Sequence, residues 1–230
     1  MSDLELQALR LSLRVAATAT LATLPLALLL ALALARGRWR GKALLEAAIN
    51  LPLVLPPVVI GYALLIAFGR QGPLGRWLNE WFGITFVFTF RGAVLAAAVM
   101  ALPLMVRAVR QALEAIDRGL EDAARTLGAS RLDAFASVTL PLAAPGLLSG
   151  AVLGFAASLG EFGATITFVS NVPGQTQTLP LAIYTALQSP DGEASALRLV
   201  GCSVLLALGA LALAQWSHHR VARWLGQEAA

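Results

Sequence analysis

Long apolar stretches separated by short charged segments run along the whole chain. A membrane-spanning helix needs roughly 20 mostly apolar residues, and five stretches meet this requirement. They lie at about residues 13–35, 44–68, 92–113, 142–168 and 197–217. Residues 177–189 are apolar on one side but short, so we expect an interfacial or re-entrant helix there. The pattern predicts an all-α membrane protein with about five transmembrane helices, or six if residues 177–189 also cross.

The composition agrees with a membrane protein. Hydrophobic residues make up 58% of the chain and charged residues 13%, whereas soluble domains carry about 25% charged residues. The net charge of +4 does not indicate nucleic-acid binding, because aromatic residues are few and the arginines cluster beside apolar stretches. Such clusters are typical of charges that set membrane topology. We therefore expect the lipid bilayer as the surroundings and no nucleic-acid partner.

The distribution of Lys and Arg predicts the orientation of the spans. Eleven of the 17 basic residues fall on one side if residues 36–43, residues 107–141 and the C-terminal segment share that side. Cytoplasmic loops carry an excess of Lys and Arg, so this side is expected to face the cytoplasm. With five spans, the N-terminus then lies outside.

The sequence offers little for catalysis. Residues 37–43 come closest to a phosphate-binding loop, but the segment is one residue short and lacks the hydroxyl that binds Mg²⁺. His218 and His219 are neighbours on a helix and point apart, and the single cysteine, Cys202, lies in an apolar stretch. We expect no catalytic residue, no metal site and no cofactor in this subunit, so energy must come from another subunit.

Two of the spans carry irregular features. The second span contains three prolines, Pro52, Pro56 and Pro57. Prolines free backbone carbonyls, which in a bilayer must be met by protein or by a water-filled cavity; a kinked packing helix is the alternative. The fourth span contains three glycines at a spacing of four, Gly146, Gly150 and Gly154. Glycines on one face predict the close approach of another helix.

A charged segment between the third and fourth spans has the pattern of two short helices. In residues 116–127, Ile116, Leu120 and Leu127 fall on one helical face with an alanine between them. Gly128 stands where a left-handed residue ends a helix. Ser130 and Asp133 then have capping-box spacing, which predicts the start of a second helix.

The second short helix obtains its apolar residues from Leu132, Phe135 and Val138, and Pro141 is expected to mark the re-entry into the membrane. A surface hairpin that merely connects two spans is the simplest interpretation. However, an apolar face outside the bilayer needs something to cover it, which favours a partner protein.

The same segment resembles the EAA loop of ABC-importer permeases, whose pattern is E-A-A, three residues, G, nine residues, I-x-L-P. This sequence has Asp122-Ala123-Ala124, then Gly128, then Val138-Thr139-Leu140-Pro141 at the same spacing, with Glu121 one residue before the aspartate. In that family the segment is a coupling helix that docks on a cytoplasmic ATPase. The resemblance implies coupling roles for Glu121, Asp122, Ala123, Ala124, Gly128, Ala129, Arg131, Phe135, Leu140 and Pro141.

Three further stretches, at residues 50–65, 158–168 and 173–193, resemble molybdate permeases, with sulfate permeases as close relatives. The resemblance implies a type I ABC importer permease of the bacterial inner membrane, with residues 1–230 as a single transmembrane domain and a cytoplasmic coupling loop at residues 116–141. The implied partners are a second copy of this chain, a cytoplasmic ABC ATPase dimer and a periplasmic molybdate-binding protein. No physical property of these residues selects molybdate over tungstate or sulfate.

Several polar residues are candidates for a translocation path or its gates. Glu46 and Asn50 share a helical face near the cytoplasmic end of the second span, where they serve either a gate or helix packing. Glu161, flanked by Gly160 and Gly163, is a candidate for a gate closed by hydrogen bonds to backbone donors; a structural carboxylate at the outer rim is the alternative.

An oxyanion path needs neutral hydrogen-bond donors that bind weakly enough for the ion to leave. Ser158, Thr165 and Thr167 are candidate donors, although threonine in a membrane helix often bonds to its own backbone. A rival hypothesis is a secondary transporter driven by an ion gradient, without an ATPase. That class predicts an acidic residue at the midplane and an inverted internal repeat, and neither is evident in the sequence.

Overall fold

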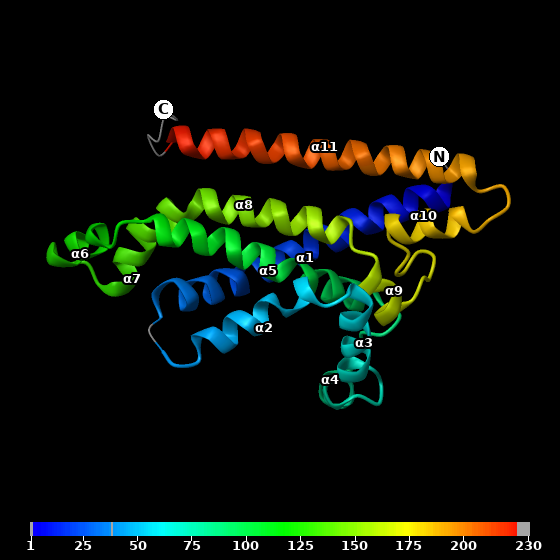
Figure 1. The fold of residues 1–230 in the computed structure, drawn as a ribbon, viewed down its shortest axis with the longest axis horizontal. Coiled ribbons are helices and arrows are strands. Elements are labelled where there is room, and N and C mark those ends of the chain that lie inside the picture. The colour runs from blue at the N-terminus through cyan, green and yellow to red at the C-terminus, as the bar shows by residue number, and fades with distance from the viewer. Residues whose placement is uncertain (1, 38, 225–230) are drawn as a thin grey trace.

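The computed structural model describes residues 2–37 and 39–224, except for the side chains of residues 213–215 and 217–224. Ser217, His218 and His219 therefore have no described side chains, and Arg38 lies outside the described residues. Four long helices run roughly along one direction (Figure 1). They are α1 (Asp3–Arg36), α5 (Phe90–Ala115), α8 (Leu140–Leu159) and α11 (Glu193–Trp224).

Shorter helices connect and flank the long ones. These are α2 (Lys42–Val54), α3 (Pro57–Phe68), α4 (Pro73–Phe82), α6 (Arg118–Thr126), α7 (Arg131–Ala134), a π-helix (Phe135–Thr139), α9 (Gly163–Val169) and α10 (Leu179–Leu187). Among the described residues, every regular element is a helix, as the apolar pattern predicts.

The core lies between α1, α5 and α8, which pack against one another. One cluster of buried side chains, including Ala27, Leu34, Met105 and Val109, joins α1 to α5, and Ile49 of α2 belongs to the same cluster. Helix α11 packs on α8 and α10 and leaves most of its apolar surface exposed. Such a surface suits contact with lipid.

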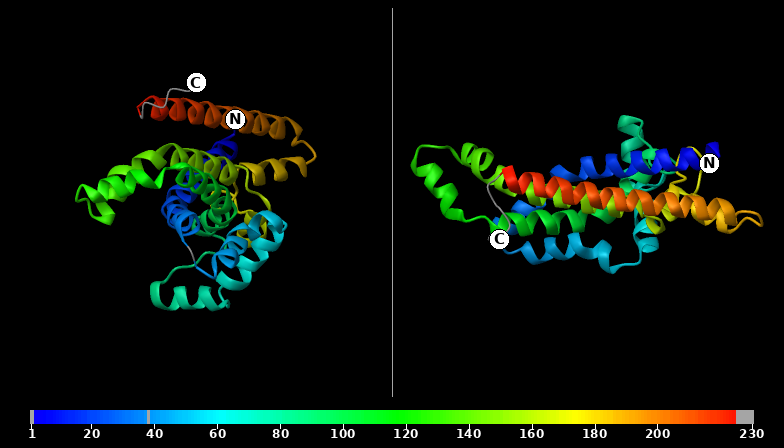
Figure 2. Two further views of the ribbon diagram at one scale, coloured as in Figure 1. Left: turned by 60° about the vertical axis from the view of Figure 1, so that its left-hand side comes forward. Right: turned by 90° about the horizontal axis from the view of Figure 1, so that it is seen from above.

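The segments that the charge pattern assigns to the cytoplasm lie at the same end of the molecule. Figure 1 shows α6, α7, the end of α1, the start of α2 and the end of α11 at its left side. The N-terminus and α10 lie at the opposite end. In Figure 2, α6 and α7 project beyond the ends of the long helices.

Four helices are long and apolar enough to cross a membrane, and a fifth crossing results if α2 and α3 count as one span. The expected second span, residues 44–68, is bent at its prolines, where α2 and α3 meet at an angle of 116°. Leu55 and Pro56 have extended backbones, with ψ angles of 145° and 136°. Each of them precedes a proline, and a following proline disfavours the helical conformation.

The expected fourth span, residues 142–168, does not form one uninterrupted helix. The helix begins earlier, at Arg131, and runs without interruption to Leu159. Pro141, which was expected to mark the re-entry into the membrane, lies within this helix. Within an α-helix, a proline ring clashes with the carbonyl oxygen four residues earlier. The preceding π-helix, whose hydrogen bonds join residues five apart, widens the backbone there and makes room for the ring. At the other end, Gly160, Glu161 and Phe162 separate α8 from α9.

Helix α10 is the element expected at residues 177–189. It has nine residues, which at 1.5 Å per residue give a length of about 14 Å, far short of the bilayer core. It packs against α1 and α11 at the outer end of the molecule. Within the described residues, α10 is therefore not a sixth crossing.

The three glycines of the fourth span face α5, as predicted. A Cβ atom at Gly150 would lie 3.1 Å from Val109 Cγ2, and one at Gly154 would lie 2.5 Å from Met105 Sδ. A Cβ atom at Gly146 would overlap the side chain of Ala112. Helix α5 thus approaches α8 more closely than any residue other than glycine would allow.

Replacing Gly146 with leucine should separate α5 from α8, because overpacking a close helix contact costs about 1–3 kcal/mol. We expect a lower thermal unfolding midpoint for Gly146→Leu in lipid nanodiscs. The matched control is Gly201→Leu on α11, where an added Cβ atom meets nothing within 4 Å. Equal midpoints for the two variants would contradict the glycine contact.

Candidate functional site

The segment between α5 and α8 forms a helical elbow, residues 117–139, at the end that the charge pattern assigns to the cytoplasm. Asp117 caps α6 by accepting a hydrogen bond from the Gly119 N–H at 2.9 Å. At the other end, Gly128 has a φ of +100°. The N–H groups of Gly128 and Ala129 donate to the carbonyls of Arg125 and Ala124, both at 3.1 Å. This pair of bonds is the Schellman motif, so the predicted glycine turn is confirmed.

The second half of the elbow begins with the predicted capping box. The Asp133 N–H donates to Ser130 Oγ at 3.2 Å, and the Ser130 N–H donates to Asp133 Oδ2 at 3.2 Å. Helix α7 then passes through the π-helix into α8 without a loop. The elbow is therefore joined directly to a transmembrane helix.

An ion pair fastens α6 to the end of α1. The Arg36 guanidinium donates to the two carboxylate oxygens of Glu121 at 2.6 and 2.7 Å, and the buried hydroxyl of Thr139 also donates to Glu121. Asp122, which occupies the motif position, is exposed and lies 3.9 Å from Arg125. Glu121 is therefore the carboxylate that connects the elbow to the bundle.

Part of the exposed surface of the elbow is apolar. Leu127 is 91% exposed and Leu132 is 80% exposed, and they stand on either side of the Gly128 turn. Leu120 and Ala123 are also exposed. We call Leu120, Leu127 and Leu132 the apolar tip. The remaining expected coupling residues are half-buried except for the exposed Arg131; they are Ala124, Ala129, Phe135, Leu140 and Pro141.

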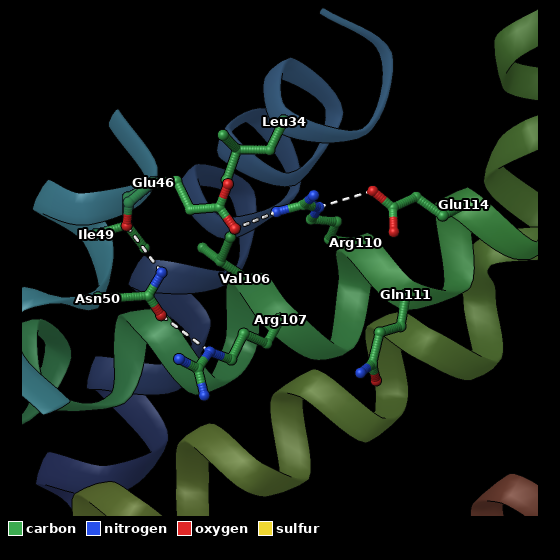
Figure 3. Close-up of a pocket in the computed structure, with 9 residues that line it drawn as sticks. All are labelled: Leu34, Glu46, Ile49, Asn50, Val106, Arg107, Arg110, Gln111 and Glu114. Carbon is green, nitrogen blue, oxygen red and sulfur yellow. Dashed lines mark hydrogen bonds and ion pairs between the residues drawn. The ribbon is translucent and has the colours of Figure 1, made fainter. Parts of the chain in front are cut away.

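A second group of candidate residues lines an open pocket between α2 and α5 (Figure 3). Glu46 and Asn50 lie there as expected, and the Asn50 side-chain amide donates to the Glu46 carbonyl at 2.8 Å. Arg110 donates to Glu46 at 2.7 Å, and Arg107 donates to Asn50 Oδ1 at 2.9 Å.

From the sequence, Arg107 and Arg110 were predicted only as charges that set membrane topology, and their bonds to Asn50 and Glu46 were not foreseen. Arg107 and Arg110 are three residues apart on an apolar helix, so they share a face. That spacing is the feature from which a functional pair could have been inferred. Arg110 also donates to Glu114 at 2.7 Å, which places it between two carboxylates.

The other predicted path residues lie at the opposite end, near the break between α8 and α9. Glu161 is buried and accepts a hydrogen bond from the Ala164 N–H at 2.7 Å. Ser158 and Thr165 are buried as well, and Ser158 Oγ has no partner among the described residues. Thr167 donates to the carbonyl of Gly163 at 2.8 Å, its own backbone. None of these four residues lines the pocket that contains Glu46 and Asn50.

Comparisons with known proteins assign the fold and the family. The family model "Binding-protein-dependent transport system inner membrane component" matches residues 8–223. The chain belongs to this family. It is 56% identical over 216 residues to the "Molybdenum transport system permease protein ModB" of Escherichia coli K12, covering 94% of both chains. The protein of the same name from Haemophilus influenzae is 54% identical, with 97% of this chain and 98% of the relative covered.

Solved structures of ABC importers have the same fold. A bacterial ABC transporter involved in the import of the acidic polysaccharide alginate has a chain that matches with a TM-score of 0.72 at 17% identity, covering 97% of this chain and 80% of that one. The MetNI methionine ABC transporter in an inward-facing form matches with a TM-score of 0.70 at 18% identity, covering 96% and 99%. The protein is thus a multi-pass permease subunit of the inner membrane with the fold of type I ABC importers.

The ion pair between Glu121 and Arg36 predicts that Glu121 holds α6 against the bundle and that the neighbouring Asp122 does not. Glu121→Gln leaves Arg36 and Thr139 without their anionic partner, so α6 should open about tenfold more often, as the loss of a hydrogen bond to a charged group implies. Hydrogen–deuterium exchange of the α6 amides measures this opening. Asp122→Asn removes the same charge one residue later and should leave exchange unchanged. Equal exchange in both variants would refute the anchoring role of Glu121.

Proposed function

We propose that this chain is the membrane subunit of an ATP-driven importer that moves molybdate, or a related oxyanion such as tungstate or sulfate, into the cytoplasm. The substrate class is supported by the two relatives named as molybdenum transport permeases, which match at 56% and 54% identity over nearly the whole chain. The family supports transport that depends on a binding protein.

The apolar tip of the elbow is the observation that carries the ATP-driven mechanism. It projects beyond the helix ends, outside the expected bilayer core, where two nearly fully exposed leucines need a covering surface. A groove on a cytoplasmic ABC ATPase supplies that surface. Hydrolysis then takes place in the ATPase, and this chain translocates the substrate without catalysing a reaction and without a cofactor of its own.

A second copy of this chain completes the path. The outward face of α2 and α3 exposes Val54, Val58 and Tyr62, and in the described structure no other helix covers it. We assign this face to the homodimer, with the path along the axis between two copies. A periplasmic binding protein delivers the oxyanion to the outer end, where Glu161, Ser158, Thr165 and Thr167 are proposed to form the outer gate. A crystal structure of a bacterial alginate ABC transporter, which has the same fold, is in complex with an alginate-bound periplasmic protein.

The elbow gives a direct mechanical connection for the gates. Nucleotide-driven closure of two ATPases moves the two elbows together. Glu121 transmits this movement to α1 through Arg36, and the π-helix transmits it to α8. Helices α1 and α8 both pack on α5, which carries the arginines of the inner pocket.

Purification and reconstitution test the proposed function against the rival secondary transporter. The tagged chain should copurify with an ABC ATPase. Proteoliposomes that contain both, with the periplasmic binding protein added outside, should accumulate radiolabelled molybdate only when ATP is present inside. Accumulation by the permease alone under a proton or sodium gradient would overturn the proposal in favour of the rival.

Gly128 should determine how tightly hydrolysis is coupled to uptake. Its φ of +100° disfavours a β-branched residue, and such strain costs on the order of 1–3 kcal/mol. Gly128→Val should therefore distort the tip and lower the ratio of molybdate taken up to ATP hydrolysed by about tenfold. Gly119→Val, within α6 and outside the left-handed region, is the matched control. An unchanged ratio in Gly128→Val would count against the coupling role of the elbow.

A further inference from the structure

The pocket between α2 and α5 has the size and lining of an ion-binding site. Its volume is about 400 Å³, which corresponds to roughly a dozen water molecules at about 30 Å³ each. A hydrated tetrahedral anion fits within this space. Arg107, Gln111 and Glu114 are exposed at its edge, so the pocket opens to the molecular surface.

The charged side chains of the pocket balance in this structure. Arg107 and Arg110 carry two positive charges, and Glu46 and Glu114 carry two negative charges. Arg110 uses its Nε atom for Glu114 and its terminal nitrogen for Glu46. Arg107 uses only Nε, for Asn50, and its two terminal nitrogens bond to none of the described residues. The pocket thus already offers free guanidinium donors.

The two carboxylates differ in how they depend on helix movement. Glu114 lies four residues after Arg110 on α5, so the ion pair between them is retained when α5 moves as a rigid helix. Glu46 and Asn50 lie on α2, so their bonds to Arg110 and Arg107 break when α2 moves away from α5. Separation of the two helices therefore leaves the α5 side of the pocket with one excess positive charge and two released donor groups.

We propose that Arg107 and Arg110 form a transient oxyanion-binding site at the inner end of the path, with Glu46 and Asn50 as the competing groups that expel the anion. This inference takes its substrate class from the proposed function. Planar guanidinium groups suit the oxygens of a tetrahedral anion. When α2 returns to α5, the Glu46 carboxylate replaces the anion on Arg110, so binding is weak enough for release.

Substitutions of the arginines and of Glu46 should change the molybdate affinity in opposite directions, which distinguishes this site from a purely structural ion pair. Isothermal titration with sodium molybdate at constant ionic strength, on the full-length protein in nanodiscs without any ATPase, measures the affinity. Arg110→Gln and Arg107→Gln should each weaken molybdate binding about tenfold, because a charged hydrogen bond is lost. Glu46→Gln should tighten it about three- to tenfold, because the competitor loses its charge.

Arg76→Gln on α4 removes an exposed positive charge far from the pocket and should leave the affinity unchanged. Arg110→Lys retains the charge without the planar donors and should fall between Arg110→Gln and the unaltered protein. If Arg110→Gln does not fold, Glu46→Gln still tests the sign of the effect.

No molybdate binding in the unaltered protein, or weaker binding in Glu46→Gln, would overturn the site. Such a result together with intact ATP-dependent uptake would leave the proposed function standing. Conversely, loss of ATP dependence together with the expected affinities would overturn the proposed function and retain the anion site.

Discussion

The close contact between α5 and α8 is the constraint on which the positions of the elbow and of the inner pocket both depend. Lipid tails are as apolar as leucine, so helices in a bilayer associate through tight packing and not through burial from water. Gly146, Gly150 and Gly154 provide that packing by allowing α5 to lie against the backbone of α8. Helix α8 continues from the elbow, and α5 carries Arg107 and Arg110. The contact thus holds the elbow and the inner pocket in one packed unit with α1.

Breaks in the helices occur where other parts of the chain can meet the exposed backbone. The bend between α2 and α3 and the interruption between α8 and α9 pack against each other. A Cβ atom at Gly163 would lie 2.8 Å from Pro57 Cβ, and one at Gly61 would lie 2.6 Å from the Ala164 carbonyl oxygen. Glu161 accepts a hydrogen bond from the first turn of α9. At the break between α8 and α9, the Ala164 N–H is therefore met within the protein, as the bilayer requires.

Local patterns could be predicted from the sequence, and contacts between distant segments could not. Spacing alone located the glycine turn at Gly128 and the Ser130 capping box, because both depend on residues a few positions apart. The pairing of Arg36 with Glu121 joins residues 85 positions apart, and the motif drew attention to Asp122 instead. Pro52, Pro56 and Pro57 indicated a break or a kink within residues 44–68, whereas the interruption of residues 142–168 after Leu159 was not predicted, because hydropathy reports how apolar a segment is and not where its backbone bends.

The claim that the apolar tip binds a nucleotide-hydrolysing partner can be tested most directly by photo-cross-linking in living cells. A benzophenone amino acid at Leu127 projects from the most exposed apolar position of the elbow. The account predicts one dominant adduct between this chain and an ABC ATPase, formed while molybdate uptake continues. Active uptake with no such adduct, or with an adduct only to a periplasmic protein, would contradict it.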